Sequence, residues 1–187
     1  RSYRADLQVV VAFRMLPEVV WGMPEYGTFN VHAALLPQYR GAAPINWAVI
    51  NGETQTGVTT FLLDHDIDTG RIILQKPFDI PDDADVEYVY DGLMHLGARL
   101  CLETLEAIVA ADGHPNTVAQ DNDDVQCLHP APKIYKETCE INWTHTAKQV
   151  YDFVRGLSPY PGAWTTLIAP DGKDTMLKVY KTRKTGR

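Results

Sequence analysis

The chain has 187 residues, of which 45% are hydrophobic and 22% are charged. This composition is typical of a folded globular protein and excludes collagen-like, coiled-coil and disordered classes. No apolar run approaches the roughly 20 residues of a membrane helix, so no membrane association is expected. The three cysteines lack CxxC spacing, and His65 with Asp64 and Asp66 has no second cluster to complete a ligand set. We therefore predict neither disulfides nor a metal site, and a cytoplasmic location.

Charge is distributed unevenly along the chain. The net charge is −7, but residues 173–187 contain six Lys or Arg and one acid, a net +5, which leaves −12 for residues 1–172. Two interpretations are open at this point: a solvated tail, or one edge of a basic surface that meets a polyanion.

The first half of the chain alternates β-like and helical segments. Residues 6–13 form an almost continuous apolar run, as in a parallel strand buried on both faces. Strands are predicted at 6–13, 28–33, 57–64 and 70–80, and short helices at 16–23 and 43–51. This order favours an α/β fold in which a parallel sheet lies between helices.

The second half begins with a long amphipathic helix. Apolar residues recur at helical spacing over 85–111, and Asp85 is the expected N-cap. The polar stretch 113–142 has little pattern and predicts a linker. A further amphipathic helix is predicted at 144–157, followed by strands at 163–169 and 175–180 that a turn joins.

Three polar side chains are expected at the carboxyl ends of strands, where ligand sites of open α/β sheets lie. They are Asn30, His32 and Asp68, and strand alternation places the first two on one face. An amide and an imidazole can stabilise an oxyanion, and a carboxylate can hold the imidazole or a relaying water, so the set suits attack on a carbonyl-type carbon. Spacing alone also permits a structural interpretation, with Asn30 in a turn, His32 in the core and Asp68 in an Asp-x-Gly turn.

Several separated motifs resemble the folate-dependent formyltransferase family. In chain order they are NVHAALLPQYRGAAPINW (30–47), GVT (57–59), IDTG (67–70), KI (133–134), INW (141–143) and VRGLSPYPGAW (154–164). The stretch RGAAPI (40–45) is more typical of members that act on methionyl-tRNA than of glycinamide ribonucleotide formyltransferase.

The resemblance implies specific site residues. Asn30, His32 and Asp68 correspond to the family's catalytic trio. The folate contacts that it implies come from the 34–37 loop, from a segment whose backbone lines the pterin pocket, and from a loop that closes over it. These residues are Ala34, Leu35, Leu36, Pro37, Arg14, Met15, Leu16 and Asp64. Ala34 stands where the family usually has Ser, which removes one hydroxyl from the expected contacts.

The resemblance also implies a one-carbon transferase that moves the formyl group of 10-formyltetrahydrofolate to initiator methionyl-tRNA for translation initiation. The full-length protein is expected to be a monomer that needs no metal. The implied fold is a Rossmann-like sheet, incomplete at its N-terminus, in a catalytic domain at 1–112. A linker at 113–142 and the start of an OB-like β-barrel at 143–187 follow. The family's first strand–helix units and most of the barrel are expected to lie outside these residues.

Three alternative functions remain open at this stage. One is a related folate-dependent formyltransferase that acts on another amine, and the second is a formyltetrahydrofolate hydrolase. The third is an inactive folate-binding fragment.

Overall fold

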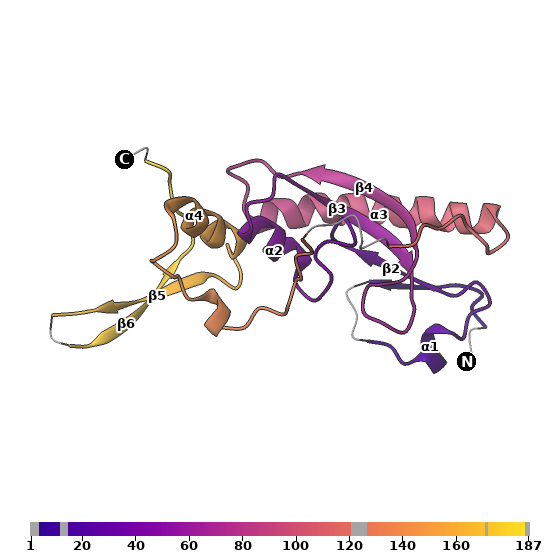
Figure 1. Cartoon of the computed structure of the whole chain (residues 1–187), viewed down its shortest axis with the longest axis horizontal. Coiled ribbons are helices and arrows are strands. Elements are labelled where there is room, and N and C mark those ends of the chain that lie inside the picture. The colour runs from indigo at the N-terminus through magenta and orange to yellow at the C-terminus, as the bar shows by residue number, and fades with distance from the viewer. Residues whose placement is uncertain (1–3, 12–14, 121–126, 171, 186–187) are drawn as a thin grey trace.

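The computed structural model describes residues 4–11, 15–120, 127–170 and 172–185, and Figure 1 shows their arrangement. Its strands are β1 (Gln8–Val11), β2 (Thr28–His32), β3 (Gln55–Leu62), β4 (Ile72–Asp79), β5 (Ala163–Ile168) and β6 (Asp174–Val179). Its helices are α1 (Glu18–Trp21), α2 (Pro44–Ile50), α3 (Val86–Ala110) and α4 (Ala147–Gly156), with a 3-10 turn, η1 (Glu137–Cys139). The first four strands form one sheet, α3 runs along one face of it, and the β5–β6 hairpin extends away from the sheet (Figure 1).

The strands of the sheet run in mixed directions. β1 is parallel to β2, with Val10 opposite Asn30, whereas β2–β3 and β3–β4 are antiparallel. The α/β class and the positions of the strands are confirmed, but the expected all-parallel sheet is wrong. The reason lies in the connections: the loop 63–71 between β3 and β4 is too short for the crossover, of about a dozen residues or more, that parallel neighbours need.

Helix α3 covers the sheet much as its periodicity predicts. Asp85 caps it, with its carboxylate accepting a hydrogen bond from the Tyr88 N–H at 3.0 Å. Leu93 and Leu100 are buried against Val58 of β3 in the main hydrophobic cluster. Each such large apolar side chain contributes about 1.5–3 kcal/mol when it is fully buried. This burial attaches the helix to one face of the sheet and leaves the other face for the site.

The C-terminal segment packs on the first part of the chain through α4. A capping box of Thr146 and Gln149 starts this helix at Ala147, so it is shorter than the predicted 144–157. The Asn46 side chain of α2 donates to the Gly156 carbonyl at 2.8 Å. Arg155, which is buried, donates to Asp152 at 2.8 Å and to the carbonyl that precedes the N-cap of α3 at 2.9 Å. These contacts join α4 to α2 and to the start of α3, so they link the parts of the chain before and after the predicted linker.

Two further predictions differ in extent from the structure. The helix expected at 16–23 forms only over Glu18–Trp21, and the strand expected at 6–13 forms over Gln8–Val11, with residues 12–14 outside the described part. Among the described residues, no helix has the length and apolar character needed to cross a membrane.

Candidate active site

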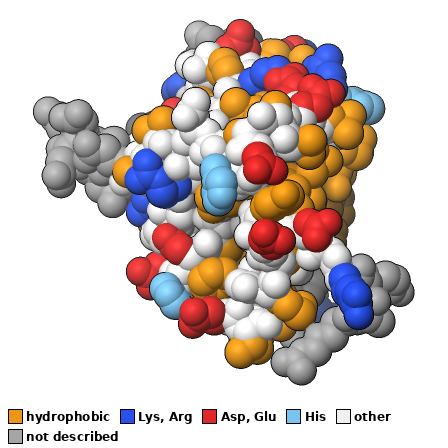
Figure 2. Space-filling model, turned by 90° about the vertical axis from the view of Figure 1, so that its right-hand side faces the viewer, with side chains coloured by type: hydrophobic (Ala, Val, Ile, Leu, Met, Phe, Trp, Pro, Cys, Tyr) orange, Lys and Arg blue, Asp and Glu red, His pale blue; other side chains and the backbone are white. Residues whose placement is uncertain are grey.

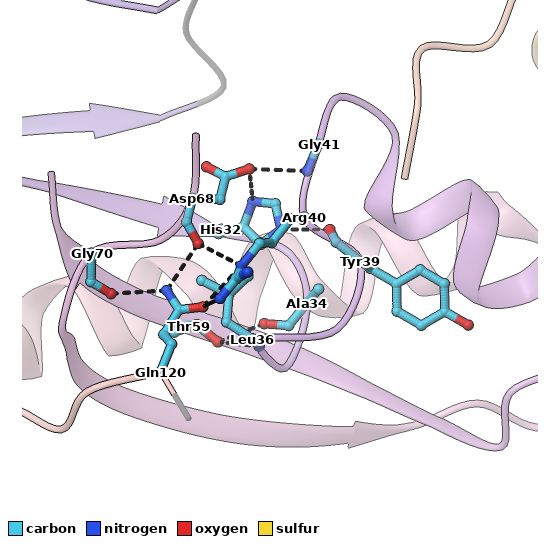
Figure 3. Close-up of polar contacts among 10 residues, drawn as sticks. All are labelled: His32, Ala34, Leu36, Tyr39, Arg40, Gly41, Thr59, Asp68, Gly70 and Gln120. Atoms are coloured by element: carbon cyan, nitrogen blue, oxygen red, sulfur yellow. Dashed lines mark hydrogen bonds and ion pairs between the residues drawn. The ribbon is translucent and has the colours of Figure 1, made fainter. Parts of the chain in front are cut away.

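His32 is the last residue of β2, and its side chain points away from α3. The preceding residue, Val31, faces α3, since a Cβ added to Gly97 of that helix would lie 3.5 Å from the Val31 side chain. Successive side chains of a strand point to opposite faces, so His32 points the other way. The imidazole is 7% exposed, and its Nε2 lies 2.9 Å from the Tyr39 carbonyl oxygen (Figure 3). A carbonyl oxygen only accepts, so Nε2 carries a proton and Nδ1 is the nitrogen left to face the site. Nδ1 lies 3.8 Å from Oδ2 of Asp68.

Asp68 reaches His32 by a route that strand order alone does not predict. Because β3 is antiparallel to β2, the loop 63–71 starts beside the first residues of β2 and folds back toward its end. Asp68 has a φ of +56°, in the left-handed region that few non-glycine residues adopt. The Gly41 N–H donates to its Oδ2 at 3.0 Å (Figure 3). The carboxylate is therefore held between a main-chain N–H and the imidazole.

Asn30 lies two residues before His32 and on the same face of β2. Its Oδ1 is buried and has no hydrogen-bond partner in the structure, one of the two such side-chain atoms among the described residues. A buried polar atom without a partner is uncommon and needs an explanation. The structure thus brings His32 and Asp68 together and places the unpartnered Oδ1 of Asn30 on the same strand face as His32, where it offers an acceptor to a bound substrate.

The backbone of the 34–37 loop is held by β3 and β4. Thr59 donates from its hydroxyl to the Ala34 carbonyl at 2.6 Å and accepts from the Leu36 N–H at 3.1 Å. Gln75 donates to the Leu36 carbonyl at 2.8 Å. Ala34 is fully buried within the main hydrophobic cluster. The hydroxyl that the family usually has at Ala34 would therefore lie in the core, so its absence does not remove a group from an exposed binding surface.

Leu35 and Pro37, the other predicted contacts in this loop, are half-buried. Leu35 lines a cavity of about 200 Å³. The remaining lining residues are Gln38, Tyr39, Glu53, Gln55, Thr56 and His129.

The predicted contacts outside this loop lie in two segments. Met15 and Leu16 follow β1, whose end is at the same edge of the sheet as the end of β2 because the two strands are parallel. Arg14 lies outside the described residues. Asp64 is exposed and accepts from the Thr69 hydroxyl at 2.8 Å, which orders the start of the loop. Seen from the α1 end of the molecule, hydrophobic side chains gather among acidic ones (Figure 2).

Four residues outside the predicted site complete the surroundings of the His32–Asp68 pair. Tyr39 provides the carbonyl for His32 and has a φ of +58°. Burial raises the pKa of Tyr39, and the hydrogen bond of its hydroxyl to Glu53, at 2.6 Å, adds to the shift. Gly41, Arg40 and Gln120 surround Asp68. Tyr39, Arg40 and Gly41 had a signal in the sequence, because all three belong to the motif at 30–47, whereas Gln120 lies outside every motif.

The approach of the linker to this region depends on Gly41. Its φ is +128°, and a Cβ there would overlap the Ala131 carbonyl, so only glycine fits. The Ala131 oxygen accepts from the Ala42 N–H at 2.7 Å, and the Ala131 N–H donates to Arg40 at 2.8 Å. Among the described residues, no three His, Cys, Asp or Glu side chains form a group that could hold a metal ion.

Comparison with known proteins adds the decisive observation. The family model described as "Formyl transferase" matches residues 1–105, more than half of the chain, and the one described as "Formyl transferase, C-terminal domain" matches residues 133–187. The chain belongs to the formyl transferase family. His32 and Asp68 lie in the first matched part, and α4 with the β5–β6 hairpin lies in the second.

Relatives of this formyl transferase include two curated proteins named methionyl-tRNA formyltransferase. The one from Parabacteroides distasonis is 61% identical over 186 residues, and the match covers 98% of this chain and 57% of the relative. The one from Bacteroides fragilis is 58% identical over 185 residues, with 98% and 56% covered. The chain thus spans somewhat more than half the length of these relatives.

Solved structures support the formyl transferase fold. A 4-N formyltransferase from Francisella tularensis matches with a TM-score of 0.76 at 20% identity, over 96% of this chain and 72% of that one. HypX from Aquifex aeolicus, solved in complex with tetrahydrofolic acid, matches with a TM-score of 0.72 at 24% identity, over 92% of this chain and 28% of that one. At these identities the likeness concerns the fold alone.

Proposed function

We propose that the full-length protein transfers the formyl group of 10-formyltetrahydrofolate to the amino group of initiator methionyl-tRNA in the cytoplasm. The observation that carries the chemistry is the pairing of His32 with Asp68, on the same side of the sheet as Asn30, whose buried Oδ1 has no partner. The choice of acceptor is supported by the 61% identity to a methionyl-tRNA formyltransferase.

The site residues fit a formyl donor as co-substrate. Attack of an amine on a formyl carbon produces a tetrahedral oxyanion, which amide and imidazole N–H groups stabilise. The unpartnered Oδ1 of Asn30 is an acceptor for the N–H of the incoming amine, and the Nδ2–H groups of the same amide are the donors for the oxyanion. The Nε2 proton of His32 is engaged by Tyr39, so in the imidazolium form the Nδ1–H is the group available to the oxyanion or to Asp68.

In the proposed reaction the neutral amine forms a bond to the formyl carbon, and Asn30 with His32 stabilises the negative oxygen. Asp68 holds the imidazolium and assists the movement of the amine's proton to N10 of the folate. The carbon–N10 bond then breaks, which releases tetrahydrofolate and the formylated amine. The proton lost by the nucleophile is the one that the leaving nitrogen gains.

The test uses the full-length protein and a labelled formyl donor. His32→Ala and Asp68→Asn should each lower turnover about 10²–10⁴-fold, because each removes charge stabilisation or proton transfer. Donor affinity should change far less, since the predicted pterin contacts lie on other residues. His95→Ala is a matched control, because that histidine is exposed on α3. Turnover near the wild-type value in either site variant would exclude these roles.

The same assay separates the alternatives. Transfer to methionyl-tRNA supports the proposal, transfer only to a nucleotide-sugar amine indicates a related formyltransferase, and release of formate without an acceptor indicates a hydrolase. Donor binding without any of these reactions would overturn the proposed activity.

A further inference from the structure

We propose that Gln120, in the linker after α3, is a positioning residue that holds the turn carrying Asp68 in its reactive geometry. The inference rests on the proposed function only in assigning Asp68 to the reaction. It extends the site to a segment that the sequence shows merely as a polar connection.

The amide of Gln120 uses both of its ends. Its Nε2 donates to the carbonyl oxygens of Asp68 at 2.9 Å and Gly70 at 2.8 Å, and so spans the turn from one side to the other (Figure 3). Its Oε1 accepts from Arg40, at 2.7 Å from Nη2 and 3.1 Å from Nε. Glutamine thus fits this position chemically, since it presents two N–H donors and an acceptor on one planar group.

Arg40 and Gly41 add further contacts to the same turn. Arg40 Nε also donates to the Asp68 carbonyl, at 3.1 Å, and the next residue, Gly41, donates its N–H to the Asp68 carboxylate. Main chain and side chain of Asp68 are therefore fixed by one continuous set of contacts. Gln120 joins this set to the chain beyond α3.

The contacts matter because the conformation that they hold is unfavourable in isolation. Asp68 has a φ of +56°, and a non-glycine residue in the left-handed region costs about 1–3 kcal/mol and persists only where its surroundings hold it. Without the two donations from Gln120, the turn can relax and move the carboxylate away from His32. Misplacement of a catalytic group by about 1 Å can lower a rate about 10²-fold.

The experiment compares three variants of the full-length protein. Gln120→Met removes all four hydrogen bonds at similar length. Gln120→Glu keeps an acceptor for Arg40 but cannot donate to the turn when ionised. Thr117→Val is the matched control in the same linker, because it removes the 2.7 Å hydrogen bond that Arg71 donates to the threonine hydroxyl without touching Asp68.

Both Gln120 variants should lower kcat about 10–100-fold while donor Kd stays nearly constant, because only the placement of Asp68 changes. For Thr117→Val, both kcat and donor Kd should stay within about twofold of the wild-type values. The decisive measurement is a double-mutant cycle that combines Gln120→Met with Asp68→Asn. If Gln120 acts through Asp68, Gln120→Met should change kcat by less than about twofold in the protein that already carries Asp68→Asn.

Two results would overturn the proposal. One is wild-type kcat in both Gln120 variants with a lowered Tm, which indicates a structural contact only. The other is an equal loss of kcat with and without Asp68, which indicates an effect by another route. If the wild type prefers a different acceptor, or releases formate, the ratios are measured with that reaction, so failure of the proposed function is recognised separately. Should the methionine variant not fold, the glutamate variant completes the same cycle.

Discussion

Tyr39 separates two roles within one residue. Its main chain serves the site: the carbonyl accepts from His32, and the N–H donates to the His129 carbonyl of the linker at 2.7 Å. Its phenol serves stability, because it donates to Glu53 and accepts from the Asn51 amide at 3.2 Å. A side-chain change that keeps the ring should therefore affect stability more than turnover.

We expect Tyr39→Phe to lower the free energy of unfolding by about 1–2 kcal/mol at neutral pH, because Glu53 and Asn51 lose a hydrogen-bond partner. The folded state raises the pKa of Tyr39 above its ordinary 10.0. The stability that this shift represents is present below pH 10 and is lost as the pH rises above it. The Tyr39→Phe variant has no phenol to ionise and does not lose this stability. The difference in the free energy of unfolding between wild type and variant should therefore become smaller in alkaline solution.

Urea denaturation of both proteins at neutral pH and above pH 10 measures this difference, with turnover as the companion value. A difference in the free energy of unfolding that stays constant across this pH range would contradict the raised pKa of Tyr39.

The sequence predicted part of the site for sound physical reasons. The two-residue spacing of Asn30 and His32 places them on one strand face whatever the sheet direction, and this holds. Asp68 was expected at a strand end beside them, yet it arrives through a folded-back loop. Gln120 could not be predicted, since it is 52 residues away in a stretch without periodicity and acts only through its tertiary contacts.

At the scale of elements, periodicity located helix α3 but did not report every residue that it buries. Gly97 and Thr104 also face the sheet, and Thr104 pairs with the Thr60 hydroxyl at 2.8 Å, which makes a polar residue acceptable in the core. Strand directions were mispredicted because an apolar run indicates a buried strand but not its orientation. Orientation depends on the connections, and the short loop 63–71 sets it for β4.

Two glycines of α3 allow a matched test of packing. A Cβ at Gly97 would lie 3.5 Å from Val31 and 3.8 Å from Val58, which is ordinary contact. Gly97→Ala should therefore stabilise the protein by about 0.5–1 kcal/mol, because alanine favours the helix. A Cβ at Gly92 would overlap the end of the Phe78 ring. Forcing that ring aside costs about 1–3 kcal/mol.

In chemical denaturation, Gly97→Ala should have a higher free energy of unfolding than wild type, and Gly92→Ala a lower one. The reverse order would show that the Phe78 ring moves freely and that the Gly97 site does not accept a methyl group.

For the molecule as a whole, the packing of α4 against the start of α3 depends on a small polar cluster around the buried Asp152. Asp152 of α4 accepts from Lys148 at 2.5 Å and from Arg155 at 2.8 Å, and its side chain is 4% exposed. Arg155 extends the cluster to Ala84, and Lys184 of the basic C-terminal segment pairs with Asp82 at 2.5 Å. At least one residue of that segment therefore forms an ion pair with the rest of the protein, although both of its partners remain exposed to solvent.

The two cations beside Asp152 should differ in their energetic weight. Arg155→Met should cost about 3–5 kcal/mol, because it removes the buried partner of a buried carboxylate. Lys148→Met removes an ion pair whose cation is 61% exposed, and should cost at most about 1 kcal/mol. Thermal and urea denaturation of both variants provide the comparison, and equal losses would show that burial does not determine the strength of this pair.

The linker's return to the site has a consequence for synthesis on the ribosome. Asp68 is made long before the residue that braces it, since Gln120 follows 52 residues later. At about 5–20 residues per second, this interval lasts about 3–10 s. His129 and Ala131, which hold Tyr39 and the Arg40–Gly41 segment, are made later still. The nascent chain therefore carries His32 and Asp68 for several seconds before it can organise them, so the site is completed only after the linker has emerged and folded back.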